Sequence, residues 1–387
     1  MTMQGSGETG KTAGILFSGF DAVGIGMLQA GISPAWAIEK EPEIAAVAQM
    51  NLSHKIIVAD ILSIDPALLE QVDLLHASPP CPSFSIANAG ALETEIDLAL
   101  ARKVAEFVRV LKPRFFTLEN VRLYRKSESW LKIILPALFA GGYMVDAAVL
   151  CAAAFGVPQE RWRFIVRAVR GGFVPWLPPA EPWQGWFQAV EDLIPGLPES
   201  QFAGWQMAVM PENLKTIIVA NGYYENLVHR AAEEPIFTIT ANSNQAGLKA
   251  FIVNSQQTNP SRPLTVRDQD DPMFTILSNM LAKNSPPKAF IVDCQYGGDP
   301  KKETRGLTIS PDSQPMFTVM AGQNRRTIRA QLSTGRVVSM SVHALARFQS
   351  FPNWYRLPEN KILACKGIGN AYPSLWYRKL AEGLIKS

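Results

Sequence analysis

The sequence is poor in the residue types that build metal centres and disulfide frameworks. Its 387 residues include only four cysteines and four histidines. The cysteines, Cys81, Cys151, Cys294 and Cys365, lie far apart and lack the close spacing of zinc ligands or of a disulfide scaffold. We therefore expect a reduced protein of the cytoplasm that needs no metal.

Charge and long apolar runs are also scarce. Charged residues make up 18% of the chain and the net charge is +3, which permits nucleic-acid binding without arguing for it. The apolar runs are too short to span a bilayer, and we expect no signal peptide and no membrane contact. With 47% hydrophobic residues, the chain can nevertheless bury a sizeable core, in roughly two or three domains.

Residues 5–12 match the phosphate-loop pattern G-x-x-x-x-G-K-[ST] letter for letter. That loop binds phosphate only between a strand and a helix, where backbone N–H groups converge. Here only four residues precede the pattern, and the apolar residues 14–17 after it are typical of a strand. We therefore predict a flexible N-terminal tail over residues 1–13 and no nucleotide triphosphate site.

From residue 14 onward, short apolar runs alternate with helical patterns, which predicts a mostly parallel sheet with helices on both faces. One helix is marked by apolar residues that share a face: Ile96, Leu100, Val104, Phe107, Val108 and Leu111. We predict strands near residues 14–17, 34–39, 56–58, 72–76, 114–118, 143–150 and 161–168. The expected fold is α/β and Rossmann-like.

A proline-stiffened loop carries a candidate for covalent chemistry. Cys81 follows Pro79-Pro80 and a buried-strand pattern, and Glu119 lies at the end of another apolar strand. A thiol and a carboxyl group at two strand ends can serve as nucleophile and acid. The alternative is a buried thiol and a Glu-Asn pair that caps a helix.

The first strand is followed by a small, glycine-bearing turn over residues 17–26, as close approach of a ligand to the backbone requires. Glu39 ends the second strand, where a carboxylate can accept hydrogen bonds from ribose hydroxyls. Asp60 follows the third strand and suits an adenine amino group. An ordinary tight turn explains the glycines about as well.

The order of these segments resembles that of the cytosine-carbon-5 DNA methyltransferases. The segments similar to family motifs are Phe17-Ser18-Gly19 with Gly26 and Gly31, Pro80-Cys81, Glu119-Asn120-Val121, and residues 155–163, 346–352 and 369–373. Residues 155–163 fit the pattern Gln-x-Arg-x-Arg. The resemblance covers residues 14–170 and 336–387.

The resemblance implies transfer of a methyl group from S-adenosylmethionine to carbon 5 of a cytosine flipped out of duplex DNA. Cys81 would add to carbon 6, and Glu119 would hold a proton against ring nitrogen 3. Arg161 and Arg163 would steady the base and the charge near its carbonyl oxygen. The implied cofactor-binding residues are Phe17, Ser18, Gly19, Glu39, Asp60, Pro80 and Asn370.

Some positions depart from the family pattern. Asp21 and Ala22 stand where the first motif usually has glycines, and Asp21 would repel the methionine carboxylate unless it turns away or bonds a backbone N–H. Pro82 replaces a frequent glutamine. His343-Ala344 replaces the Arg-Glu of the ninth motif, and we expect His343 to be a packed or surface histidine.

The middle of the chain differs in composition. Residues 171–198 are rich in Pro and Trp, which indicates a domain boundary. The pattern Pro-Ile-Phe-Thr-Ile at 235–239 recurs with small changes at 272–276 and 315–319, and Ala-Phe-Ile-Val at 250–253 recurs at 289–292. These repeats predict a mainly β domain over residues 171–335.

By its position, this inserted domain would be the target-recognition domain, and the basic residues of its later part suit DNA phosphates. Stacked hairpins with a solvated face are the alternative. The catalytic domain would then comprise residues 14–170 and 336–387. Trp376, Leu380 and Leu384 repeat every four residues, which predicts a closing helix that returns to this domain.

We therefore predict a cytoplasmic, monomeric methyltransferase that acts on double-stranded DNA near the nucleoid, with a cognate restriction endonuclease as a candidate partner. Three alternatives stay open: an RNA cytosine-5 methyltransferase, a catalytically silent DNA-binding homologue, and a class I methyltransferase for another substrate. Four intact residues argue against a silent homologue, namely Cys81, Glu119, Arg161 and Arg163, whereas Asp21 and Ala22 leave it open. The sequence does not name the base that deprotonates carbon 5.

Overall fold

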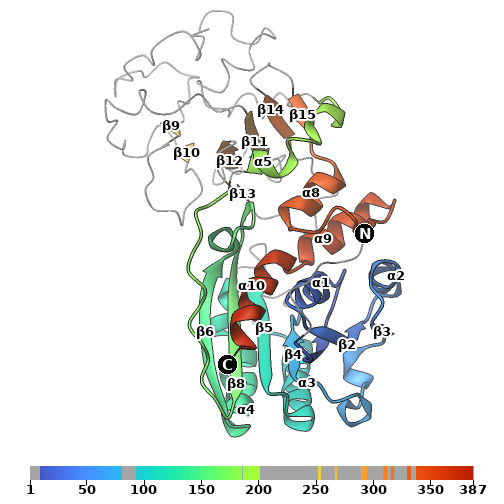
Figure 1. Ribbon diagram of the computed structural model, residues 1–387, viewed down its shortest axis with the longest axis vertical. Coiled ribbons are helices and arrows are strands. Elements are labelled where there is room, and N and C mark those ends of the chain that lie inside the picture. Colours follow the sequence, from blue (N-terminus) through green and yellow to red (C-terminus); the bar gives the residue numbers. More distant parts are fainter. Residues whose placement is uncertain are drawn as a thin grey trace, which may run out of the picture.

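The structure is a computed structural model, shown in Figure 1. It describes residues 9–80, 93–184, 186–200 and 337–386, and short segments at 252–253, 266–267, 289–293, 308–311, 315–317 and 329–332. Cys81, Pro82 and Cys294 lie outside the described residues, as do the repeat segments 235–239 and 272–276.

A seven-stranded sheet forms the larger part of the described fold, with strand order β3-β2-β1-β4-β5-β8-β6. Strands β3, β2, β1, β4 and β5 are parallel, and β8 runs antiparallel to both β5 and β6. The strands are β1 (Thr12–Leu16), β2 (Ser33–Glu39), β3 (Lys55–Val58), β4 (Leu74–Ala77), β5 (Phe115–Val121), β6 (Tyr143–Cys151) and β8 (Trp162–Arg170). The predicted Rossmann-like α/β fold is confirmed.

Helices cover both faces of this sheet, which is why its central strands are apolar on both sides. On β5, Phe115 packs with α1 (Ala22–Gln29), α2 (Pro42–Asn51) and α10 (Ser374–Leu384). The next residue, Phe116, packs with α3 (Glu95–Leu111) and α4 (Leu135–Ala140) on the other face. Successive side chains of a strand point to opposite faces, so adjacent phenylalanines belong to two separate cores.

Helix α3 begins with a capping box, in which Thr94 and Asp97 each bond the other's backbone N–H. All six predicted apolar residues lie on this helix; five of them are buried, and Ile96 is 52% exposed. In the first turn of α3, Asp97 is the buried side chain, because it completes the cap with Thr94.

The N-terminal segment enters the sheet directly. Thr9 bonds the carbonyl of Gly31, and β1 begins at Thr12, two residues before the start predicted for the first strand. Lys11, the lysine of the phosphate-loop pattern, lies 3.7 Å from Asp73 Oδ1. A strand therefore follows the pattern where a phosphate loop needs a helix, which agrees with the rejection of a nucleotide site.

The C-terminal segment returns to the sheet through α8 (Val342–Phe348), α9 (Lys361–Asn370) and α10, coloured orange to red in Figure 1. Trp376, Leu380 and Leu384 of α10 are buried, as predicted. Helix α10 crosses α1 so closely that a Cβ on Gly26 would lie 2.6 Å from the Ser374 carbonyl oxygen. The closing helix thus packs on the first helix of the chain.

The described parts of the middle region are mainly short strands. An antiparallel sheet has the order β12-β11-β14-β15, formed by Thr308–Pro311, Ala289–Asp293, Arg329–Leu332 and Val337–Ser339. Two further pairs are β9 (Ile252–Val253) with β10 (Val266–Arg267) and β13 (Met316–Phe317) with β7 (Gln159–Glu160). The domain limit predicted between residues 335 and 336 falls between the paired strands β14 and β15.

Residues 186–200 also pack against the C-terminal segment. Helix α5 (Trp186–Val190) shares a core with α8, in which Trp186 and Val190 are buried beside Leu345. The remaining short helices span 61–63, 66–68, 122–126, 129–134, 152–155 and 194–196. Among the described residues, no helix is long and apolar enough to cross a membrane.

Candidate active site

The carboxyl ends of the parallel strands meet at one edge of the sheet, where α/β proteins bind their ligands. Most predicted site residues lie at this edge. Phe17-Ser18-Gly19 follows β1, Glu39 ends β2, Asp60 follows β3, Pro80 follows β4, and Glu119 lies near the end of β5. The parallel pairing of these strands is therefore what brings the predicted residues together.

Glu39 ties the turn after β1 to the segment after β2. Its Oε2 accepts a hydrogen bond from the Gly19 N–H at 2.9 Å, and its Oε1 accepts one from the Glu41 N–H at 2.8 Å. The turn itself is unusual, because Phe17 and Gly19 both have positive φ, 60° and 59°. A positive φ at a residue with a side chain is strained, and such strain is concentrated at functional sites.

Ser18 gives this turn a feature that suits a polar ligand. Its Oγ is buried and has no hydrogen-bond partner among the described residues. Buried hydroxyls are almost always hydrogen-bonded, so an orphaned one calls for an additional partner. Together with the Glu39 carboxylate, it fits the hydroxyl-rich and charged parts of S-adenosylmethionine.

Asp60 lies at the start of a short helical turn. Its Oδ1 accepts from the Leu62 N–H at 3.0 Å, and Lys40 Nζ lies 2.6 Å from Oδ2. The Lys40 ammonium and the Leu62 N–H lower the pKa of the Asp60 carboxyl. The side chain stays 37% exposed, so an ionised acceptor faces this edge of the sheet.

The Asp21 side chain, in the turn between β1 and α1, bonds a backbone N–H. Its side chain is fully buried, accepts from the Gly24 N–H at 2.9 Å, and lies 2.6 Å from His54 Nε2. The bond to the Gly24 N–H is one of the two arrangements expected from the sequence to avoid repulsion of a methionine carboxylate. His54 was not singled out from the sequence, because the two residues are 33 positions apart and no motif links them.

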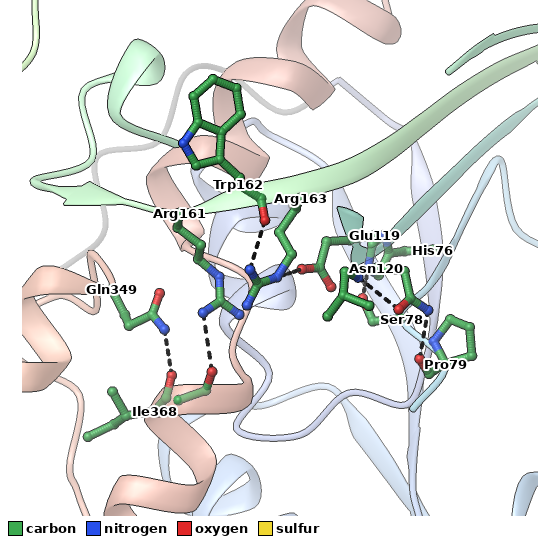
Figure 2. Close-up of polar contacts among 12 residues, drawn as sticks. His76, Ser78, Pro79, Glu119, Asn120, Arg161, Trp162, Arg163, Gln349 and Ile368 are labelled. Carbon is green, nitrogen blue, oxygen red and sulfur yellow. Dashed lines mark hydrogen bonds and ion pairs between the residues drawn. The ribbon is translucent and has the colours of Figure 1, made fainter. Parts of the chain in front are cut away.

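The predicted acid lies in a buried ion pair. Arg163 Nε is 2.9 Å from Glu119 Oε1, across the antiparallel strands β8 and β5, as Figure 2 shows. The two side chains are only 16% and 8% exposed. Burial lowers the pKa of the Arg163 guanidinium, and the Glu119 carboxylate opposes that change. The pair fixes the direction of the Glu119 carboxyl group.

Arg161 lies beside this pair and is 2% exposed. Both guanidinium groups extend to the same side of the strand in Figure 2, as expected for residues spaced by two. Arg161 Nη1 donates to the carbonyl of Gly369 at 3.3 Å. Burial, and then the charge of Arg163, lower the pKa of Arg161 well below its usual value.

Buried glutamines join the Gln-x-Arg-x-Arg segment to the last two motifs. Gln159 Nε2 donates to the Phe348 carbonyl at 3.2 Å, and Gln349 Nε2 donates to the Ile368 carbonyl at 2.9 Å. Asn370, predicted to approach the methionine part of the cofactor, is the exposed last residue of α9 and directly follows the carbonyl that Arg161 contacts. Motifs about 200 residues apart in the chain thus meet at one place.

The strand before Cys81 is held by side chains of β5. Asn120 Nδ2 donates to the Pro79 carbonyl at 3.0 Å. His76, on β4, is within hydrogen-bond distance of Ser78 Oγ at 2.7 Å and of Thr117 Oγ1 at 2.9 Å. Sequence analysis missed the role of His76, although a histidine inside an apolar strand was a visible signal.

Desolvation lowers the pKa of the fully buried His76 to about 3, so its imidazole is neutral near pH 7. One ring nitrogen then donates and the other accepts, and Thr117 Oγ1 continues the contact to the Tyr377 hydroxyl at 3.2 Å. Pro80 is the last described residue before the loop, and Cys81 lies outside the described residues. The described contacts therefore position the strand end that leads to Cys81.

The two thiols that the structure describes are poorly suited to nucleophilic attack. Cys151 and Cys365 are buried and free, and burial raises the pKa of the Cys151 thiol to about 12. Within the described ranges, no group of three or more His, Cys, Asp or Glu side chains could hold a metal ion. His343 is exposed, one of the two environments predicted for it.

Comparison with known proteins decides the family. The model of the C-5 cytosine-specific DNA methylase family matches residues 14–386. The chain belongs to this family. Its alignment therefore includes the middle region as well as the two segments that carry the motifs.

Relatives within the C-5 cytosine-specific DNA methylase family support the assignment. The chain is 25% identical over 383 residues to the type II methyltransferase M1.HphI of Haemophilus parahaemolyticus, covering 96% of this chain and 86% of the relative. It is 34% identical over 179 residues to the type II methyltransferase M.AquIA of a Picosynechococcus strain, covering 41% and 71%.

Among solved structures, the Entamoeba histolytica methyltransferase EhMeth shares the fold, with a TM-score of 0.53 and 13% identity over 97% of this chain and 98% of that one.

Proposed function

We propose that the protein is a DNA (cytosine-5-)-methyltransferase that modifies a cytosine flipped out of duplex DNA through a covalent adduct with Cys81. The observation that carries this proposal is the joint placement of Glu119 and Asn120 at the end of β5. Glu119 is paired with Arg163, and Asn120 holds the carbonyl of Pro79, two residues before Cys81. Two adjacent residues of β5 thus have separate parts. Glu119 is the proposed acid, and Asn120 holds the chain segment that leads to the proposed nucleophile Cys81.

In the proposed reaction, the Cys81 thiolate forms a bond from Sγ to carbon 6 of the cytosine. A free thiol of pKa about 8.5 is only a small fraction thiolate at neutral pH, so activation helps the attack. An acid that withdraws electrons from the cytosine ring makes carbon 6 easier to attack. Glu119 would supply a proton to ring nitrogen 3, and carbon 5 then carries the electron density needed for methylation. Removal of the carbon 5 proton by a base expels the Cys81 thiolate, and return of the nitrogen 3 proton to Glu119 restores the ring.

The arginines have separate parts in this proposal. Arg163 engages Glu119 Oε1 and so leaves Oε2 to face ring nitrogen 3. Arg161, held against the Gly369 carbonyl, would stabilise the negative charge that develops near the cytosine carbonyl oxygen. Both groups are buried, so their fields act in a poorly screened environment.

S-adenosylmethionine would supply the methyl group. Glu39 would accept from its ribose hydroxyls, Asp60 from its adenine amino group, and Phe17, Ser18 and Gly19 would surround its methionine part. Pro80 and Asn370 would complete the site. Support comes from the orphaned Ser18 Oγ and from the ionised Asp60 carboxylate.

The restriction context is a further part of the proposal. The relatives named above are type II methyltransferases, so we propose that this chain protects DNA against a cognate restriction endonuclease. It would act in the cytoplasm as a monomer on double-stranded DNA, because one chain carries every proposed site residue. Protection of genomic DNA against a panel of endonucleases, in cells that express the protein, would reveal the target sequence.

The mechanism is tested by incubating the protein and S-adenosylmethionine with duplex DNA that contains 5-fluorocytosine. Fluorine cannot leave carbon 5 as a proton, so the enzyme should remain covalently attached to the DNA under denaturing conditions. The Cys81→Ser variant is the control and should give no adduct. An adduct on transfer RNA alone would indicate the RNA enzyme, and cofactor binding without any adduct would indicate a silent homologue.

A further inference from the structure

The turn between β1 and α1 contains an acidic residue in a conformation that usually selects glycine. Asp21 has φ 56° and ψ 42°, in the left-handed region, and its side chain is fully buried. Aspartate tolerates this region better than most residues, because its short side chain can bond nearby backbone groups. The backbone conformation is therefore accounted for, but the buried charge needs a partner.

Both carboxylate oxygens of Asp21 are engaged. Oδ1 accepts from the Gly24 N–H and caps α1, and Oδ2 lies 2.6 Å from His54 Nε2. The His54 side chain follows α2 and is only 6% exposed. A buried carboxylate is tolerated when it is paired and hydrogen-bonded, so His54 is the group that makes this position of Asp21 possible.

Gly24 completes the arrangement. A Cβ at residue 24 would lie 2.6 Å from Asp21 Oδ2 and 2.7 Å from Oδ1, so any other residue would displace the carboxylate. Asp21, Gly24 and His54 therefore form one matched set, in which Gly24 leaves room for the Asp21 carboxylate and His54 pairs with it.

This set borders the proposed cofactor turn, Phe17-Ser18-Gly19. The Asp21 N–H donates to the Ser18 carbonyl at 2.8 Å, and Ser18 carries the orphaned hydroxyl. The carbonyl of Phe20, the residue directly before Asp21, accepts a hydrogen bond from the Tyr355 hydroxyl at 2.6 Å. The backbone around Asp21 is thus held to Ser18 and to Tyr355, next to the proposed cofactor residues.

We propose that His54 is a positioning residue for S-adenosylmethionine, because it holds the Asp21 carboxylate away from the cofactor turn. Without His54, Asp21 Oδ2 loses its partner, and the carboxylate can rotate toward Phe17-Ser18-Gly19, beside which the methionine carboxylate of the proposed cofactor would lie. Two negatively charged carboxylates close to each other would oppose binding of the cofactor. The inference rests on the proposed function for the identity of the ligand.

The inference predicts a dependence between two substitutions. His54→Ala should weaken S-adenosylmethionine binding by about tenfold or more, measured by calorimetry without DNA. His54→Gln, which can still donate to Asp21, should recover most of that affinity. Asp21→Gly removes the charge, so Asp21→Gly with His54→Ala should bind the cofactor as Asp21→Gly alone does.

Controls separate positioning from general destabilisation. His343→Ala changes an exposed histidine outside the site and should leave cofactor affinity unchanged. The affinity for duplex DNA and the melting temperature are measured for every variant, and Asp21→Asn replaces Asp21→Gly if the glycine variant does not fold.

An equal effect of His54→Ala in the wild-type and Asp21→Gly backgrounds would overturn the inference, as would an unchanged affinity of His54→Ala. The proposed function is judged separately, by the wild-type adduct with 5-fluorocytosine DNA. If the wild-type protein binds S-adenosylmethionine but forms no adduct, the proposed function fails, and the His54→Ala comparison still tests the role of His54 in cofactor binding. A wild-type protein that does not bind the cofactor overturns both.

Discussion

Arg163 of β8 and Glu119 of β5 form an ion pair between neighbouring antiparallel strands, with Arg163 Nε 2.9 Å from Glu119 Oε1. Because Arg163 orients the carboxyl group of Glu119, the two residues should act as a unit. We expect Glu119→Gln to lower kcat for methyl transfer by about 10²–10⁴-fold, as for removal of a general acid. Arg163→Ala should lower kcat by about 10²-fold.

The double variant distinguishes a unit from two independent residues. Arg163→Ala with Glu119→Gln should be no slower than Glu119→Gln alone, measured by incorporation of labelled methyl groups into DNA. Arg170→Ala removes an exposed arginine at the far end of the same strand and should behave as wild type. Rate reductions that multiply in the double variant would contradict coupling between the pair.

Three basic residues follow Glu119-Asn120-Val121 on a short helix, and all three are exposed: Arg122, Arg125 and Lys126. At this place they can bind phosphates of the strand that carries the target cytosine. Each replacement by Ala should weaken DNA binding and make the slope of log K against log salt shallower by about 0.9, because one phosphate fewer is neutralised. Arg109 is an exposed residue in the last turn of α3, and Arg109→Ala is the matched control. If the salt slopes of the three test variants equal the slope of Arg109→Ala, the assignment to phosphate binding is contradicted.

The sheet could be predicted because each strand carries its own local signal. Adjacent buried residues such as Phe115 and Phe116 mark a strand covered on both faces, and the motif order placed the candidate site residues at the ends of such strands. The exposure of Ile96 could not be predicted from periodicity, because the choice between Ile96 and Asp97 depends on the cap that Asp97 makes.

Contacts between distant segments were beyond the sequence. The partner of Asp21 is His54, and the partner of Arg161 is the Gly369 carbonyl, 208 residues away. The sequence predicted that Asp21 would repel the methionine carboxylate unless its side chain were otherwise engaged. It did not predict that His54 would be the partner. Likewise, the hydrogen bond between Asn120 and the Pro79 carbonyl depends on the register of β4 against β5.

His76 should make stability depend on pH. Its pKa in the folded protein is lowered to about 3 from 6.5, so between these values the unfolded chain binds a proton that the folded protein does not. Stability therefore falls as pH decreases below about 6.5, by at most about 1.4 kcal/mol per pH unit from this residue. Urea unfolding of wild type and His76→Gln between pH 5 and pH 7 measures the difference in slope. The His76→Gln variant should show the shallower dependence, and parallel curves would exclude a contribution from His76.

Two glycines in C-terminal helices should respond oppositely to the same substitution. A Cβ on Gly367 of α9 would lie 2.2 Å from Cε2 of the Phe20 ring, and Phe20 directly follows the proposed cofactor turn. Gly367→Ala should therefore displace Phe20, cost about 1–3 kcal/mol of stability and weaken S-adenosylmethionine binding. Gly383 of α10 has no atom within 4 Å of such a Cβ, so Gly383→Ala should stabilise the protein by up to about 1 kcal/mol through helix propensity and leave cofactor affinity unchanged. Thermal unfolding and calorimetry on both variants test this contrast, and an unaltered affinity in Gly367→Ala would show that the ring of Phe20 does not set the shape of the turn.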